Sequence, residues 1–131
     1  MVAEARVHVD VEAAVREWAR GAVASVQRRV FFGPNNSAPF PQIVLFRIAG
    51  PDDRCLIQFD VWAESKAQAA AVAAELMTAA DHMSRYAHAG VLLHGALPEG
   101  ARWQPDEESD QPRYIVDMTV FATADGSGDA S

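Results

Sequence analysis

The sequence predicts a single α+β domain, with two helices packed on one side of a mainly antiparallel, mixed β-sheet. Two segments, 11–26 and 66–86, carry the apolar spacing and capping residues of helices. Several other segments are rich in β-branched and aromatic residues and are bounded by Gly, Pro, Asn or Asp, which is typical of strands. A chain of 131 residues can bury one core but not two.

The helix at 11–26 begins after Asp10, whose side chain suits an N-cap. Its apolar stripe includes Trp18, and Arg and Glu side chains occupy the other side. A short strand at 28–32 follows, and then a loop rich in Pro and Asn that we expect at the surface. Phe40 lies in this loop between two prolines, so it either folds back onto the core or is offered to a partner.

Residues 43–49 and 55–63 are predicted to form a hairpin closed by Gly50-Pro51-Asp52-Asp53. The first strand is apolar except for Arg47, which indicates that both of its faces are covered. In the second strand, alternate residues point to opposite faces. One set, expected under a helix, is Ile57, Phe59 and Val61; the other, expected to be partly wet or to meet another subunit, is Gln58, Asp60 and Trp62.

Ser65 and Gln68 form a capping box for the helix at 66–86. A strand at 91–97, a turn at 98–100 and a short strand at 101–104 are expected next. An exposed acidic loop at 105–112 precedes the last strand, 113–123, which contains Asp117. The domain thus spans residues 1–124, and residues 125–131 are expected to form a flexible tail because they have nothing to bury.

Composition excludes several classes of protein. The net charge of −7 disfavours tight binding to nucleic acid, which needs clustered Lys and Arg. No apolar run is long enough to cross a membrane. Because Cys55 is the single cysteine and no apolar signal segment opens the chain, we expect synthesis in a reducing cytoplasm.

Catalytic, cofactor and metal residues are not predicted. The chain has no serine on a nucleophile elbow and no Gly-rich phosphate loop before a helix. Its four histidines lack the close pairing of zinc ligands, and Cys55 is expected to be a buried structural residue. Asp60 and Asp117 are costly to bury alone, so we expect them to pair with arginines such as Arg47 or Arg113, within one chain or between chains. Acid–base work by the two carboxylates is the remaining alternative.

Several segments together resemble the tail terminator (tail completion) proteins of long-tailed phages and prophages, in particular those of actinobacterial hosts. The likeness runs from about residue 11 to residue 124 and rests on the order of its segments. These are VFFG at 30–33 before the Pro/Asn loop, PQIV at 41–44, GPDD at 50–53, QFDVWA at 58–63 before the Ala-rich helix, WQPD at 103–106 and QPRYIVD at 111–117.

The resemblance implies a structural virion protein rather than an enzyme. Such a protein forms a ring, usually a hexamer, on the head-proximal end of the tail tube, stops tube polymerisation and joins the tail to the head. Its partners would be the major tail tube protein and a head–tail connector protein, and DNA would pass through the lumen without specific binding. Acids at 106–110, or those on the polar helix faces, would line the bore.

Five residues are predicted at interfaces, because their side chains are large and apolar or charged where the strand pattern exposes them. They are Phe40, Arg47, Asp60, Trp62 and Asp117. Two other functions stay open at this point. One is a neighbouring head-closure protein, and the other is a small cytoplasmic hydrolase or isomerase that uses Asp60 with a histidine.

Overall fold

The computed structural model describes residues 10–33 and 38–125. Residues 126–131 of the predicted tail, and the segments 1–9 and 34–37 of the predicted domain, lie outside the described residues. The elements in chain order are α1 (Val11–Ala22), η2 (Ala24–Val26), β1 (Val30–Phe32), β2 (Gln42–Ala49), β3 (Arg54–Trp62), α2 (Lys66–Asp81), β4 (Tyr86–His88), β5 (Val91–Trp103) and β6 (Arg113–Ala124).

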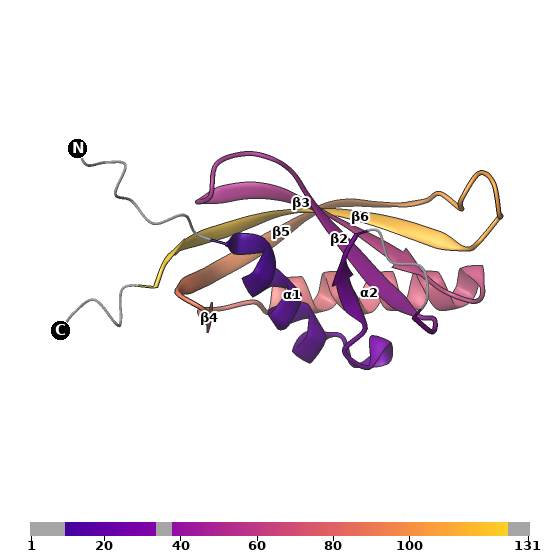
Figure 1. Cartoon of the computed structure of the whole chain (residues 1–131), viewed down its shortest axis with the longest axis horizontal. Coiled ribbons are helices and arrows are strands. Elements are labelled where there is room, and N and C mark those ends of the chain that lie inside the picture. Colours follow the sequence, from indigo (N-terminus) through magenta and orange to yellow (C-terminus); the bar gives the residue numbers. More distant parts are fainter. Residues whose placement is uncertain (1–9, 34–37, 126–131) are drawn as a thin grey trace.

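The strands form one sheet in the order β1-β2-β3-β6-β5-β4. Among the described strands, only β1 and β2 are parallel, and every other neighbouring pair is antiparallel. Both helices lie on the same side of this sheet, beneath it in the view of Figure 1. The predicted fold class is therefore confirmed.

The core fills the space between the sheet and the helices. Ile57, Phe59 and Val61 are fully buried, as the alternation of β3 predicts, and they pack in one cluster with Trp18 of α1 and Leu76 of α2. The helix α1 contacts both edge strands, β1 and β4. Because β1 and β4 lie at opposite edges of the sheet, the sheet must curl around α1, and the opposite face is left convex.

The first helix is shorter than predicted. It begins as expected, with the Asp10 carboxylate accepting from the Ala13 backbone N–H at 3.0 Å, but it ends at Ala22 instead of Val26. Residues 24–26 form the 3-10 helix η2 because Glu75 of α2 accepts hydrogen bonds from Ala24 N–H and from the Ser25 hydroxyl. The next strand also begins late, at Val30, since Gln27 and Arg28 have positive φ angles of 50° and 66°.

The prediction for the second helix was right at its start and wrong at its end. The Ser65 hydroxyl accepts from Gln68 N–H at 3.1 Å, which is the predicted cap. The helix stops at Asp81 rather than near Tyr86, with His82 as its C-cap. Arg85 then adopts a left-handed conformation, φ 53°, and turns the chain so that Tyr86–His88 pairs with β5 as the edge strand β4.

The predicted break at 98–100 was also wrong, because β5 runs without interruption from Val91 to Trp103. Register irregularities occur between Leu93 and Gly95 and between Pro98 and Gly100. Pro98 is tolerated because the far side of β5 is unpaired here: β4 pairs only with Val91–Leu93 among the described residues. A longer β5 brings Ala101 to Trp103 opposite the start of β6, and so changes which side chains meet on the convex face.

Candidate interface on the convex sheet face

The convex face of the sheet lies away from both helices (Figure 1), and no helix covers it among the described residues. Asp60 lies opposite Ile115, Gln58 lies opposite Asp117, and Trp62 lies opposite Arg113. Since directly paired residues in an antiparallel sheet point to the same face, these side chains form one surface. Three of the five predicted interface residues, Asp60, Trp62 and Asp117, are thus brought together.

Asp60 is the most buried charged group of this surface, with 4% of its area exposed. One of its oxygens accepts from the Gln58 amide at 2.8 Å, and the other lies 3.4 Å from an Arg113 guanidinium nitrogen. Burial raises the pKa of the Asp60 carboxyl, and the Gln58 hydrogen bond and the Arg113 charge offset part of that rise. The predicted pairing with Arg113 is confirmed, and it lies within one chain.

Arg113 links the carboxylate to an aromatic ring. Its guanidinium lies over the ring of Trp62, 4.7 Å from the centroid, and its Nε donates to the Gln104 carbonyl at 2.8 Å. An arginine held over an aromatic face in this way keeps its charge while covering apolar surface. Trp62 is consequently half-buried rather than fully exposed.

Asp117 pairs with Arg102 of β5 at 2.7 Å, and Arg102 also donates to Gln104 at 3.3 Å. Arg102 was not among the predicted interface residues, because the predicted turn at 98–100 separated it from the last strand. Only the continuous β5 places Arg102 directly opposite Ile115 and near Asp117.

Two apolar side chains extend the same face toward the other end of β5 and β6. Leu97 lies opposite Thr119 and is 54% exposed, and Phe121 lies opposite Arg54 and is 37% exposed. We call the set the convex-face surface. It consists of Gln58, Asp60, Trp62, Leu97, Arg102, Arg113, Asp117 and Phe121.

The remaining two predicted interface residues, Arg47 and Phe40, lie elsewhere. Arg47 donates to Asp52 at 2.8 Å and to the Gly50 carbonyl at 2.8 Å, and it lies 4.0 Å from Glu12 of α1. The Asp52 hydrogen bond holds the pKa of Arg47 above its ordinary value. Its partner is thus the hairpin turn and not Asp60.

Phe40 is half-buried on the wall of a hollow of about 580 Å³ beside η2 and the first half of α2. Its neighbours Pro39 and Pro41 line the same hollow, together with Arg29. Arg29 donates to the Pro41 carbonyl at 3.0 Å and so fixes the end of the loop against η2. Phe40 therefore partly folds back, as one of the two alternatives predicts, and partly faces solvent.

The described residues include a buried carboxylate, Asp60, and a buried thiol, Cys55. They contain no group of three His, Cys, Asp or Glu side chains placed to hold a metal ion. Asp60 contacts Gln58 and Arg113, and none of its hydrogen bonds within the described part of the chain is with a histidine, which the acid–base alternative would require. Cys55 is fully buried, and this burial raises the pKa of its thiol, as expected for a structural cysteine.

Among the described residues, no helix has both the length and the apolar character needed to cross a membrane. Comparison of the chain with protein-family models and with curated proteins found no match.

Proposed function

We propose that this protein is a structural virion component of the tail terminator kind. Its copies close into a ring, a hexamer in the family that it resembles, on the head-proximal end of the tail tube of a long-tailed phage. The observation that carries the proposal is the convex-face surface, a broad sheet face that both helices leave open.

The chemistry of this surface suits contact with protein. Protein interfaces combine aromatic and aliphatic side chains with arginine and paired charges. The convex-face surface has Leu97 and Phe121 exposed at one end and Trp62 under a guanidinium at the other. Its two ion pairs are already satisfied within the chain, so a partner can cover them without leaving a buried charge alone.

The sheet edges are poorly suited to pairing with a further strand. On β1, the Arg20 side chain donates to the Val30 carbonyl at 3.1 Å. This carbonyl is therefore already used and is less available to a further strand. On β5, Pro98 has no N–H to donate, and the strand is irregular at two places, between Leu93 and Gly95 and between Pro98 and Gly100. Copies of the chain are therefore expected to join through side-chain surfaces rather than by extending the sheet.

A ring built head to tail uses two unlike surfaces per subunit and leaves neither of them free once it closes. A closed ring with one face on the tail tube would stop tube growth, and its other face would meet the head–tail connector. The net charge of −7 is compatible with a lumen that DNA passes without binding. The ring would be part of the virion, and its subunits would be synthesised in the host cytoplasm.

The proposal is tested by adding the purified protein to polymerising tail tube protein of the same phage. Wild-type protein should cap the tubes and stop their growth. The variants Leu97→Asp and Phe121→Asp, which put a charge on the convex face, should cap less well, whereas Ala74→Asp on the exposed side of α2 should act like wild type. Tubes that grow at the same rate with and without the protein would exclude the terminator function. An ordered complex with a head connector alone would instead favour a head-closure protein.

A further inference from the structure

Arginines gather on one side of the molecule around α1 and β1. Arg16 lies over the ring of Phe32, 4.2 Å from its centroid, and its buried Nε has no acceptor among the described residues. Phe32 itself is 40% exposed. Arg28, at the end of the η2 turn, has 63% of its side chain exposed.

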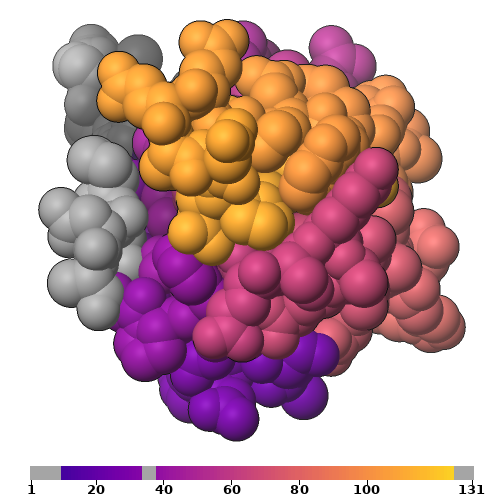
Figure 2. All heavy atoms as spheres, turned by 90° about the vertical axis from the view of Figure 1, so that its right-hand side faces the viewer, coloured from indigo at the N-terminus to yellow at the C-terminus, as the bar shows by residue number. Residues whose placement is uncertain are grey.

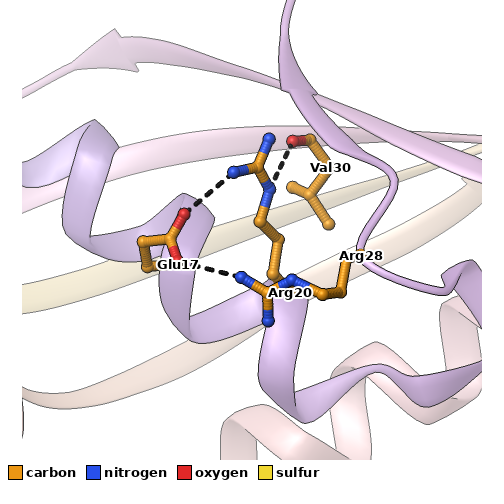
Figure 3. A network of polar contacts seen from close by, with 4 residues as sticks. All are labelled: Glu17, Arg20, Arg28 and Val30. Atoms are coloured by element: carbon orange, nitrogen blue, oxygen red, sulfur yellow. Dashed lines mark hydrogen bonds and ion pairs between the residues drawn. The ribbon is translucent and has the colours of Figure 1, made fainter.

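Glu17 is the acid that balances this group of arginines, and Figure 3 shows its contacts. Its two oxygens bind Arg20 at 2.9 Å and Arg28 at 3.2 Å. Burial opposes the charge on Glu17, but the Arg20 hydrogen bond and the charges of Arg20 and Arg28 hold its pKa below the ordinary value. Glu17 contacts two of the three arginines, Arg20 and Arg28, so one carboxylate faces three guanidinium groups and the surface stays positive. We call it the arginine surface, and it consists of Arg16, Arg20, Arg28 and Phe32.

The loop between β5 and β6 carries the opposite charge. Asp106 accepts from the backbone N–H groups of Glu108 and Ser109 and from the Ser109 hydroxyl, and Asp110 N–H donates to the Asp106 carbonyl at 2.9 Å. These bonds give the loop a defined turn. Glu107, Glu108 and Asp110 are exposed and have no basic partner among the described residues. We call residues 106–110 the acidic loop.

The two charged regions lie apart in one molecule. Figure 2 looks at the end of the molecule where the acidic loop projects, with its orange atoms at the top and the indigo atoms of the α1–η2 segment at the bottom. Among the described residues, no ion pair joins the two regions. They therefore cannot neutralise each other within one chain.

We propose that the acidic loop of one copy binds the arginine surface of the next copy, which sets the head-to-tail order of the ring. The partner is a second copy because each surface supplies the charge that the other lacks, and because one chain carries both. This inference rests on the proposed ring. The acids at 106–110 would then lie in the contact between copies. The bore would be lined by the other predicted set, the acids on the polar helix faces.

The contact combines charge with an ordered framework on both sides. Exposed ion pairs contribute little affinity each, but complementary charges speed and orient association. The Glu17 network holds Arg20 and Arg28 in place before binding, and the Asp106 turn holds the loop, so little side-chain freedom is lost on contact. The exposed ring of Phe32 adds apolar area beside the charges.

Crosslinking through one introduced cysteine per chain tests the geometry. Two variants, Arg28→Cys and Glu108→Cys, are prepared separately, and Cys55 is buried and does not compete. A short bifunctional maleimide at low salt and high protein concentration should give crosslinked dimers when the two variants are mixed. Each variant alone should give far fewer, because unlike surfaces meet. Equal crosslinking of Arg28→Cys with itself, or no crosslinking in the mixture, would overturn the proposal.

Charge reversal tests the chemistry in the full chain. Arg28→Glu and Glu108→Arg should each weaken self-association about tenfold at low salt, and the double variant should recover most of it. Arg85→Glu and Asp81→Arg change the same charges at exposed positions outside both surfaces and should have no effect. The contact would be refuted if the single reversals left self-association unchanged, or if the double variant did not recover it. Crosslinked rings that fail to stop tube growth would support the contact between copies and exclude the terminator function.

Discussion

Asp60 and Arg113 lie 53 residues apart in the chain and meet across β3 and β6, with 3.4 Å between an oxygen of one and a nitrogen of the other. The carboxylate is almost fully buried on a sheet face that no helix covers among the described residues. Arg113 and its neighbour Trp62 form the cover instead. This pair therefore stabilises the convex face from within the chain.

Removing Arg113 alone should destabilise the fold, because Asp60 would stay buried without its cation. For Arg113→Met we expect a loss of about 2 kcal/mol in the free energy of unfolding, measured by urea denaturation. The double variant Asp60→Asn, Arg113→Met should recover part of that loss, since the amide carries no charge. Additive effects of the two substitutions would show that the pair does not interact.

The raised pKa of Asp60 predicts a pH dependence with a definite sign. A folded-state pKa above the unfolded value means that the folded chain binds the proton more tightly, so stability falls as pH rises from the ordinary aspartate value of 3.8 through the raised one. Asp60→Asn removes the carboxyl group that titrates in this window. Its free energy of unfolding relative to wild type should therefore increase across that window, in urea titrations at a series of pH values. A difference that is flat or falls with pH would contradict the assignment.

Glu75 is expected to matter for stability although it lies on the polar side of α2. It accepts from Ala24 N–H at 2.8 Å and from the Ser25 hydroxyl, and so holds η2 against α2. Glu75→Ala should lower the free energy of unfolding by about 1–2 kcal/mol. Glu75→Gln keeps one acceptor oxygen and should lose less. Asp81→Ala, at the exposed end of α2, serves as the control, and an equal effect of all three would argue against the cap.

Two glycines should respond in opposite directions to a methyl group. A Cβ on Gly33 would overlap the Phe46 ring and lie 2.6 Å from Val44, so Gly33→Ala should cost about 1–3 kcal/mol of stability. A Cβ on Gly21 meets nothing within 4 Å, and Gly21 lies in α1, so Gly21→Ala should add about 0.5–1 kcal/mol. Thermal unfolding of the two variants gives the comparison. A stabilised Gly33→Ala would show that the Phe46 ring moves freely.

Features that depend on neighbouring residues in the chain could be predicted from the sequence. The caps at Asp10 and Ser65 are confirmed, and so is the burial of Ile57, Phe59 and Val61. Such features follow from local hydrogen bonding and from the period of a strand. The pairing of Asp60 with Arg113 was also among the predicted alternatives.

Features that depend on distant residues were missed. Glu75 ends the first helix from 51 residues away, which no local pattern shows. Tyr86–His88 becomes a strand only because β5 offers an edge, and Pro98 fits inside β5 only because that edge is unpaired there among the described residues. The arginine surface combines α1 with β1 in space, so its relation to the acidic loop could be seen only in the folded chain.

The length of the phage tail tests the central claim most directly. Virions assembled without this gene, examined by electron microscopy, should show tails that are longer than normal, variable in length and unattached to heads, and the intact gene supplied in trans should restore the normal length. Tails of normal length, joined to heads in the absence of this protein, would contradict the account.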